Sequence, residues 1–308
     1  MWGNNQSTIK DTISFTGHGL HTGKEVKISL LPNEANTGIV FIRTDLEKNN
    51  IIEANFKNVS SAVLCTKIKN SFGVSVSTIE HLMAAFYLTG IDNLIVNIDG
   101  PEVPIMDGSA KEFVEKINKC GLKNLNKKRK FIKINKFTEI KLADKSISIS
   151  PKKDNFNVKF TLSYDNPLIK TQTNDVNFYN TNLEEIYSAR TFCLFEDVEK
   201  VKAMGLGKGG SLENAIVVKG NKILNDGGLR SNKEFVNHKI LDLAGDFMLA
   251  GMRIIGSVEC EHGGHSLTND FLRKLLSDTK NFSIVEKSHN LTSIQNTPSD
   301  QKRIAVNA

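Results

Sequence analysis

The feature that most constrains the fold of this 308-residue chain is a change of hydrophobic period, which occurs once in each half of the sequence. In the first half Val26, Ile28 and Leu30 alternate with polar residues, a pattern typical of a half-buried strand. From residue 79 to 87 the apolar side chains instead recur at helical spacing, which predicts a helix that ends at Gly90.

Further elements follow from the same two periods. Residues 39–41 predict the strand after the first one, and Leu94, Val96 and Ile98 predict another. A second helix is expected from about residue 109 to Gly121. Both helices are preceded by an S-x-x-E pattern, at residues 77–80 and 109–112, which predicts a capping box at each start.

The second half repeats the order of strands followed by helices. We expect strands up to about residue 162, a strand at 253–259, and helices near 184–189, 233–250 and 267–276. The chain length suits two domains, and the order of elements predicts the α+β class, with two similar two-layer α/β sandwich domains.

A polar, basic stretch separates the two halves. Residues 123–130 show no apolar period, and the run Lys127-Lys128-Arg129-Lys130 has the composition of a solvated linker. We therefore expect an N-terminal domain at 1–126 and a C-terminal domain at 127–288. The polar, aperiodic segment 289–308 is predicted to be a disordered tail.

Charge and cysteine content narrow the class of protein. The net charge is +6 and the sequence pI about 9.0, but no nucleic-acid-binding motif accompanies this charge, so we expect no nucleic-acid partner. Cys65, Cys120, Cys193 and Cys260 form no C-x-x-C pair, which disfavours a cysteine zinc site and a disulfide framework. No signal peptide and no apolar stretch of roughly 20 residues is found, so a cytoplasmic protein without stable membrane insertion is expected.

The strongest local signal for chemistry is the segment from His238 to Asp242. Positions i and i+4 lie on one face of a helix, so both side chains are able to reach the same metal ion. Catalytic zinc takes nitrogen and oxygen ligands, usually three from the protein, and keeps one position for water. The alternative is an exposed His–Asp pair without a metal.

A second signal is Glu80-His81 at the start of the first helix. His81 is a candidate third ligand, and Glu80 would then lie beside a metal-bound water as a general base. The alternatives are a capping role for Glu80 and a buried structural histidine. His265, after two glycines, is a candidate acid or ligand. Asp246 lies one helical turn after Asp242 and is able to orient an imidazole.

The glycine-rich stretch at residues 205–211 is similar to a phosphate-binding loop only in composition. A P-loop has Ser or Thr directly after its Gly-Lys, whereas here Gly209 follows Lys208. This departure argues against nucleoside triphosphate hydrolysis.

Five segments together resemble the UDP-3-O-acyl-N-acetylglucosamine deacetylase family. These are residues 16–23 (TGHGLHTG), 77–85 (STIEHLMAA), 101–110 (PEVPIMDGSA), 188–192 (SARTF) and 238–242 (HKILD). They occur in the family's order and span residues 9 to 276. The resemblance implies two α+β domains with the helices packed between the sheets, and an active site in the cleft where the domains meet.

The resemblance also implies roles for individual side chains. His81, His238 and Asp242 match the ligands of a zinc ion, Glu80 the general base and His265 the general acid. Thr191 matches a group that holds the oxyanion, and Asp246 the partner of the acid histidine. Residues 195–217 match an insert that forms a hydrophobic passage for the acyl chain. The substrate contacts implied by these matches come from Lys239, Phe192, Leu20, His262, Phe195, Ser211, Ala215 and Val217.

The implied reaction is zinc-dependent hydrolysis of the acetamide of UDP-3-O-acyl-N-acetylglucosamine, with release of acetate, in lipid A biosynthesis. Zinc lowers the pKa of its water towards about 7, and one oxyanion donor such as Thr191 contributes about 3 kcal/mol. Glu80 takes the proton of the water, alone or together with His265, and His265 protonates the leaving amine. The partner is thus a small nucleotide-sugar lipid precursor, and we expect a monomer.

Three positions depart from the family pattern. His262 and Gly263 stand where the family usually has a lysine and a serine, and the lysine is associated with the substrate diphosphate. A protonated His262 is expected to replace this contact in part. Gly207 stands where a bulkier residue is common, which is expected to alter the acyl passage.

Two other functions remain open at this point. One is a metallohydrolase that acts on a different N-acetylated sugar. The other is a non-catalytic protein that binds a sugar nucleotide, although binding alone does not require a general base at Glu80 or an acid at His265. Zinc content separates the two classes, because only the hydrolase needs about one bound metal ion.

Overall fold

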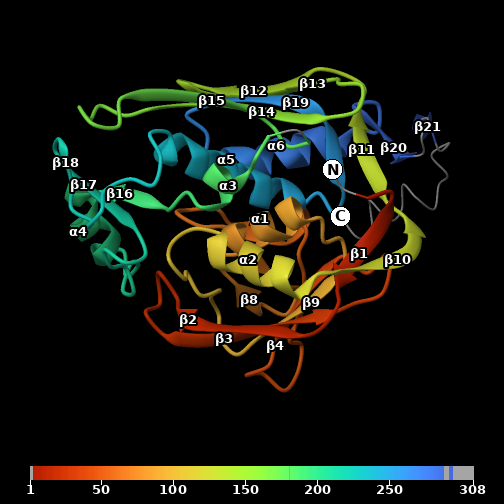
Figure 1. Cartoon of the computed structure of the whole chain (residues 1–308), viewed down its shortest axis with the longest axis horizontal. Helices are drawn as coiled ribbons and strands as arrows, with labels where there is room; N and C mark the ends of the chain where they lie inside the picture. The colour runs from red at the N-terminus through yellow and green to blue at the C-terminus, as the bar shows by residue number, and fades with distance from the viewer. Residues whose placement is uncertain (1–2, 180, 288–290, 294–308) are drawn as a thin grey trace.

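The computed structural model describes residues 3–179, 181–287 and 291–293 of the chain. Two large sheets lie on opposite sides of a layer of helices, with a small lobe at one end (Figure 1). The predicted α+β architecture, with helices packed between the sheets, is confirmed. In the described part of the chain, no helix is both long and apolar enough to cross a membrane.

The first sheet has five strands in the order β2-β3-β9-β4-β5. Only the central β4–β9 pair is parallel, and the other pairs are antiparallel. Val26, Ile28 and Leu30 are buried on one face of β3, as the alternation predicts. The bounds are β2 (Ile13–His18), β3 (Glu25–Pro32), β4 (Ile39–Arg43), β5 (Ile51–Glu53) and β9 (Leu94–Ile98).

Two helices cover the inner face of this sheet. They are α1 (Glu80–Thr89), which ends at Gly90 in the left-handed conformation, and α2 (Lys111–Cys120), which ends at Gly121. The helices were predicted correctly, but both capping boxes are wrong. Ser77 donates to the carbonyl of Pro101, and Ser109 accepts from the N–H of Lys111 at 3.1 Å, so neither forms the predicted box with its glutamate. Tertiary contacts take the carboxylate of Glu80 instead, as described below.

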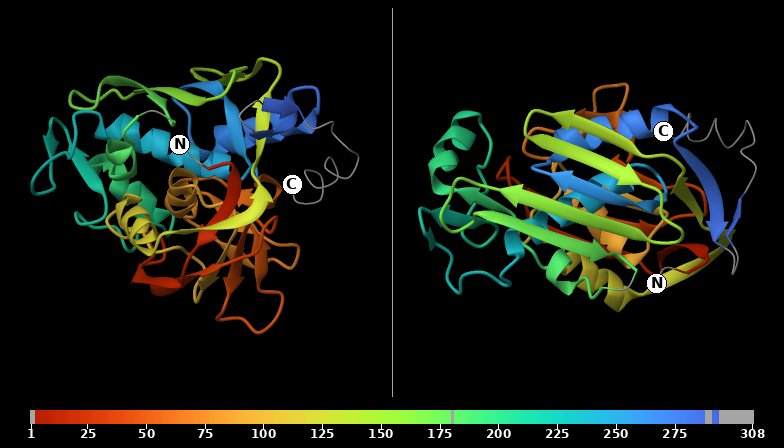
Figure 2. Two further views of the ribbon diagram at one scale, coloured as in Figure 1. Left: turned by 45° about the vertical axis from the view of Figure 1, so that its right-hand side comes forward. Right: turned by 90° about the horizontal axis from the view of Figure 1, so that it is seen from above.

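The second sheet has eight strands, and β19 is at its centre. Six strands follow the order β12-β13-β19-β11-β20-β21. Strand β14 also pairs with β19, and β15 pairs with β14. Seen from above, these strands cover the helices (Figure 2). The bounds are β11 (Lys130–Ile134), β12 (Thr138–Leu142), β13 (Lys145–Ser150), β14 (Phe156–Ser163), β15 (Thr171–Asn177), β19 (Arg253–Glu261), β20 (Phe282–Lys287) and β21 (Leu291–Ser293).

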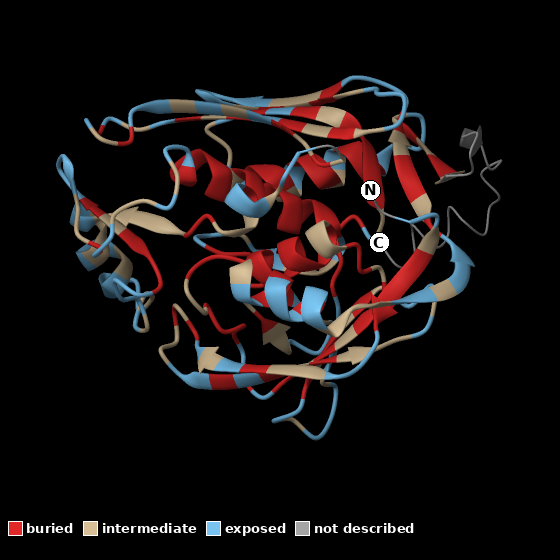
Figure 3. Ribbon diagram, in the orientation of Figure 1, coloured by how far each residue is buried: buried red, intermediate tan, exposed pale blue. Residues whose placement is uncertain are grey.

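Besides the helix of the lobe, the second half contributes three helices: α3 (Glu184–Tyr187), α5 (Glu234–Met248) and α6 (His265–Ser277). Nearly every residue of α5 is buried, because it packs on α1, on α6 and on the second sheet. The buried residues of the chain accordingly concentrate in the helical layer and on the inner faces of the sheets (Figure 3). This layer is where α1 brings residues of the first half against α5.

The basic run between the halves is not a solvated linker, which corrects the prediction for residues 127–130. Residues Leu122–Lys128 form strand β10, which pairs antiparallel with β1 (Asn5–Ile9) along one side of the molecule (Figure 2). The expected domain boundary between residues 126 and 127 lies within β10. The division of the chain into two domains stays a prediction.

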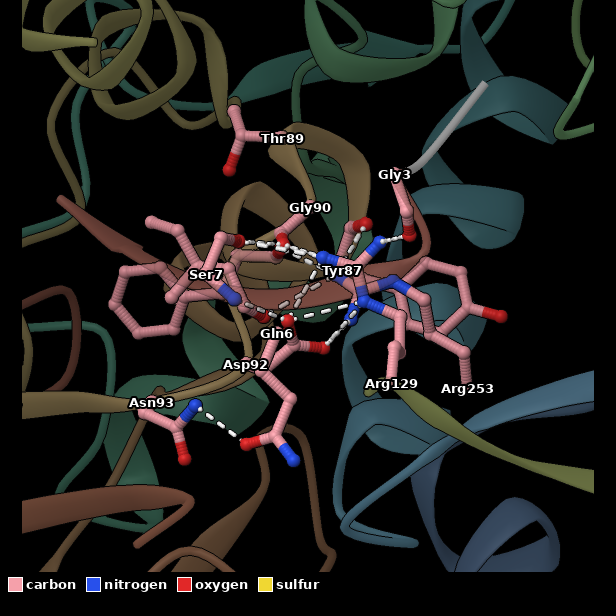
Figure 4. A network of polar contacts seen from close by, with 12 residues as sticks. Gly3, Gln6, Ser7, Tyr87, Thr89, Gly90, Asp92, Asn93, Arg129 and Arg253 are labelled. Carbon is pink, nitrogen blue, oxygen red and sulfur yellow. Dashed lines mark hydrogen bonds and ion pairs between the residues drawn. The ribbon is translucent and has the colours of Figure 1, made fainter. Parts of the chain in front are cut away.

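Arg129 is only 3% exposed, because it takes part in a buried ionic network (Figure 4). Its guanidinium donates to Asp92 at 2.8 Å and to the carbonyl of Gly90 at 2.8 Å. Arg253 donates to the other oxygen of Asp92 and to the carbonyls of Phe86, Tyr87 and Ile91. The two arginines thus bind carbonyls of the last turn of α1 and of the two residues that follow it.

The remaining elements are short. The first half contains η1 (Phe56–Asn58), β6 (Val59–Ser61), β7 (Lys67–Lys69) and β8 (Ser75–Val76). The lobe at the end of the molecule contains β16 (Phe192–Leu194), α4 (Phe195–Ala203), β17 (Ile216–Lys219) and β18 (Lys222–Ile223). Most of the predicted disordered tail, 289–308, lies outside the described residues, and within it Leu291–Ser293 pairs with β20 as strand β21.

Candidate active site

His81, His238 and Asp242 come together between α1 and α5, as the sequence predicts. Each offers one ligand atom, and these atoms all lie within 4.8 Å of one another. Oδ1 of Asp242 is 3.5 Å from Nε2 of His81 and 3.4 Å from Nε2 of His238. Donor atoms about 2.1 Å from a tetrahedral zinc ion lie about 3.4 Å apart. The spacing of the three groups therefore fits one zinc ion.

The surroundings of the group also suit a cation. Oδ1 of Asp242 is buried and finds no hydrogen-bond partner in the described part of the chain. Such a buried oxygen is costly unless something satisfies it. His238 donates from Nδ1 to the carbonyl of Ala189 at 3.0 Å, which leaves the Nε2 lone pair directed at Asp242. A divalent cation would satisfy both atoms.

Protonation states favour metal binding as well. Burial lowers the pKa of His238 to about 3, despite the neighbouring carboxylate. Burial opposes ionisation of Asp242, but His238 and Lys239 outweigh this effect and hold the pKa of Asp242 well below its usual range. At neutral pH the group thus contains a neutral imidazole and a carboxylate, the forms that a metal requires.

Glu80 is buried beside these residues. Its Oε2 accepts a hydrogen bond from the backbone N–H of Thr66 at 3.0 Å, and its Oε1 lies 3.8 Å from Nε2 of His265. Burial raises the pKa of Glu80, although His265 and His81 oppose the shift. A carboxylate with a raised pKa and one oxygen directed at the site is suited to accept and release a proton.

His265 starts α6 and faces Glu80. Its Nδ1 is 2.8 Å from Oδ2 of Asp246, and the hydroxyl of Thr66 donates to the other oxygen of Asp246 at 2.6 Å. Burial by itself lowers the pKa of His265, but Asp246 and Glu80 outweigh it and raise the pKa to about 10. The imidazole is therefore protonated at neutral pH and able to act as an acid. Thr66, which contacts both carboxylates, was missed because its short segment carries no local motif.

The two helices that carry these groups approach unusually closely at Gly245. A Cβ atom at this position would lie 2.0 Å from the carbonyl oxygen of Glu80 and 3.1 Å from the nitrogen of Ala84. Sequence reasoning did not single out Gly245. A lone glycine in the middle of a predicted helix is the signal that indicates such a close contact.

Lys239 and Phe192 border the group on the side of α5. The ammonium of Lys239 donates to Oδ2 of Asp242 at 3.0 Å and lies 5.7 Å from the ring centroid of Phe192. Phe192 packs edge-on against Phe235 and Tyr164, which holds its ring in place. Both predicted contact residues are therefore next to the candidate metal ligands.

Thr191 is held through its backbone at the entrance of the lobe. Its N–H donates to the carbonyl of Gly108 at 2.8 Å, and its carbonyl accepts from the N–H of Ile216 at 2.8 Å. The preceding residues lead back to Ala189, whose carbonyl binds His238. The chain path thus places Thr191 two residues from a direct contact with the ligand group.

The other predicted contact residues lie around the lobe. Leu20 accepts a hydrogen bond from the N–H of Gly209 through its carbonyl, so the segment 205–211 packs on the first motif. Phe195 is exposed at the start of α4, with the ammonium of Lys219 4.3 Å from its ring centroid. Ser211 and Ala215 lie on the segment that leads into β17, and Val217 lies within that strand.

His262 lies at the end of β19, where its Nδ1 is 3.4 Å from a carboxylate oxygen of Asp144 in the β12–β13 turn. The next residue, Gly263, leaves no room for a side chain, because a Cβ atom would lie 2.2 Å from the sulfur of Cys260. A side chain at this position would therefore require the side chain of Cys260 to move.

Comparison with known proteins agrees with this site. The family model described as UDP-3-O-acyl N-acetylglycosamine deacetylase matches residues 6–277. A protein of that name from Geotalea uraniireducens (strain Rf4) is 44% identical over 282 residues, 91% of each chain. Its namesake from Haemophilus influenzae (strain PittEE) is 40% identical over 286 residues, 91% of this chain and 92% of the relative. The chain belongs to the UDP-3-O-acyl N-acetylglycosamine deacetylase family.

Proposed function

We propose that the chain is a zinc-dependent deacetylase that hydrolyses the acetamide of UDP-3-O-acyl-N-acetylglucosamine in lipid A biosynthesis. One observation carries the proposal: a buried His81–His238–Asp242 group lies beside Glu80, which in turn faces His265. The names of the relatives supply the substrate, and the group supplies ligands, a base and an acid in one place.

His81, His238 and Asp242 would hold the zinc ion. When bound, zinc supplies Lewis acidity to the acetamide carbonyl and lowers the pKa of water, to about 7 in well-studied enzymes. A cation between them would satisfy both the unpartnered oxygen of Asp242 and the Nε2 lone pair of His238. Zinc fits better than magnesium or calcium, since two of the three donors are imidazoles.

Glu80 acts as the general base. The N–H of Thr66 holds one of its oxygens, so the other oxygen is the one that takes a proton from the attacking water. The raised pKa of Glu80 makes it a stronger base than an exposed glutamate. After this transfer the proton is on Glu80, whose Oε1 lies 3.8 Å from Nε2 of His265.

His265 acts as the general acid. Asp246 binds Nδ1 and keeps the imidazole protonated, so Nε2 is able to deliver a proton to the leaving amine. The hydroxyl of Thr191 is proposed to hold the oxyanion that forms when water attacks. Hydrogen bonds that strengthen as charge develops lower the barrier rather than the substrate dissociation constant.

The substrate is proposed to extend from this centre in two directions. Lys239 and Phe192 border the sugar and its polar groups, and His262 contacts the diphosphate. The acyl chain would follow the lobe, along Leu20, Phe195, Ser211, Ala215 and Val217. A cytoplasmic location and a monomeric state stay predictions from the sequence.

The test is acetate release from the acylated UDP-N-acetylglucosamine, measured together with zinc content. The wild type should bind about one zinc per chain and lose activity with a chelator. His238→Ala and Asp242→Ala should lose both zinc and turnover, whereas Asp270→Ala, which changes an exposed carboxylate of α6, should keep both. Full activity in either ligand variant, or ligand binding without zinc or turnover in the wild type, would contradict the proposal.

A further inference from the structure

A single peptide group, between Ala189 and Arg190, is held at both ends by side chains of α5. Its carbonyl accepts from Nδ1 of His238 at 3.0 Å, and its N–H donates to Oε1 of Glu234 at 3.2 Å. The described backbone contains no cis peptide, and the two groups of a trans peptide point in opposite directions. The peptide therefore lies between Glu234 and His238, which are one helical turn apart on the same face of α5.

Glu234 is itself rigidly held. Its side chain is 1% exposed and accepts further hydrogen bonds from Nε of Arg190 at 2.8 Å and from Nη2 at 3.2 Å. The backbone N–H of Arg230 also donates to it. Nη2 of Arg190 is anchored in addition to the carbonyl of Gly228 at 2.8 Å. These charge-assisted bonds leave the Arg190 peptide little freedom to rotate.

The orientation of this peptide has a consequence for His238. A neutral imidazole carries one N–H, and the partner of one ring nitrogen decides which nitrogen keeps its lone pair. With the Ala189 carbonyl in place, the proton is on Nδ1, and the lone pair of Nε2 points to Oδ1 of Asp242, 3.4 Å away. If the carbonyl turned away, the opposite tautomer would compete, and that tautomer presents an N–H to the cation.

We propose that Glu234 is a positioning residue of the metal centre. By holding the N–H of the Ala189–Arg190 peptide, it directs the carbonyl of the same peptide at His238 and so fixes the tautomer that binds the cation. The inference rests on the proposed function, because it takes His238 as a zinc ligand. Thr191, the proposed oxyanion donor, directly follows this peptide in the chain. The orientation of the peptide therefore also affects the position of Thr191.

Glu234→Gln tests the proposal with little change in size. Oε1 of Glu234 accepts from the N–H and Nε of Arg190, and Oε2 accepts from Nη2 of Arg190 and the N–H of Arg230. The amide offers one accepting oxygen in place of two, so two of these four donors would face its NH2 group, and the hold on the Ala189–Arg190 peptide weakens. We expect a zinc dissociation constant 10- to 100-fold higher than in the wild type, measured by chelator competition. Turnover should fall at limiting zinc and recover largely at saturating zinc, a pattern that general destabilisation does not produce.

Two further variants separate positioning from stability. The double variant Arg190→Leu with Glu234→Leu removes both charges, so neither is left buried and unpaired. It should fold and show the same weaker zinc binding. Asp92→Asn is the matched control, because it weakens a buried ion pair with Arg253 at the other end of α1 and α5. It should lower the melting temperature without changing the zinc dissociation constant.

Unchanged zinc affinity in both folded Glu234 variants would overturn the proposal. Nitrogen NMR of histidine in the metal-free wild type gives a second test that needs no variant. His238 should show its proton on Nδ1, and a proton on Nε2 would also overturn it. A wild type that meets these expectations but releases no acetate would contradict the proposed deacetylase activity alone.

Discussion

Gly245→Ala adds one methyl group where α1 and α5 touch. The new carbon would lie 2.0 Å from the carbonyl oxygen of Glu80, about 1.4 Å short of the 3.4 Å at which ordinary contact begins. The obstacle is the backbone of another helix, which has no rotamer to change, so the two helices must separate or slide by roughly 1 Å.

This displacement acts directly on the site. Glu80 and His81 are on α1, whereas His238, Asp242 and Asp246 are on α5. Metal–ligand distances tolerate about 0.2 Å, and a 1 Å misplacement of reacting groups costs about 10²-fold in rate. We therefore expect weaker zinc binding and a fall in kcat of about 10²-fold.

The effect on stability should be smaller than the effect on function. Overpacking typically costs about 1–3 kcal/mol, and replacing a helical glycine with alanine returns about 1 kcal/mol. The net loss in the free energy of unfolding is thus about 0–2 kcal/mol. The protein should remain folded, with a melting temperature lower by a few degrees.

The assay combines urea unfolding, chelator competition and acetate release. Gly256→Ala is the matched control: its new carbon would lie 2.9–3.1 Å from side-chain carbons of Ile134 and Ile149 in the second sheet, away from the helix contact. It should lose stability but keep zinc affinity. Wild-type zinc affinity and kcat in Gly245→Ala would refute the reasoning that the helix spacing sets the site.

Three further outcomes are expected. Glu80→Gln should keep zinc but lose about 10²–10⁴-fold in kcat, and an unchanged rate would show that Glu80 only orders the backbone at Thr66. In metal-free protein His265, with its pKa raised to about 10, contributes stability that is complete below its unfolded pKa of about 6.5 and is lost as pH rises to 10. Asp246→Asn lowers that pKa, so urea unfolding at pH 7–10 should show a flatter decline with pH, and an equal slope would contradict the ion pair. Arg129→Met should lower the free energy of unfolding by about 3 kcal/mol without affecting zinc affinity, since its partner Asp92 lies at the far end of α1, and a change in zinc affinity would count against this separation.

Local patterns in the sequence were sufficient for much of the fold. The alternation at Val26, Ile28 and Leu30 and the helical spacing at 79–87 depend only on the geometry of single elements, and both predictions are confirmed. The pairing of His238 with Asp242 is equally local, because four residues span one helical turn. His81 was a candidate third ligand from the sequence, but no spacing rule connects it to the other two, and only the resemblance to a family assigned it to them.

The failures arise where distant groups compete for the same side chain. The S-x-x-E pattern at Glu80 predicts a cap, but in the folded chain Thr66 and His265 bind its carboxylate. The basic run predicts a linker, but Asp92 and the end of α1 bury Arg129. A local rule compares a side chain only with water and its near neighbours, so it fails when a stronger partner comes from elsewhere in the chain.

The sequence by itself determined which residue types are present, which element carries each of them, and which neighbours share a helix face. The tertiary structure alone decided the distances between α1 and α5, the partners of Glu80, and the hydrogen bonds that Glu234 and His238 make to the Ala189–Arg190 peptide. The reason is physical: helical and strand periods follow from backbone geometry within a few residues, whereas these contacts exist only after burial brings remote segments together and forces their polar groups to pair.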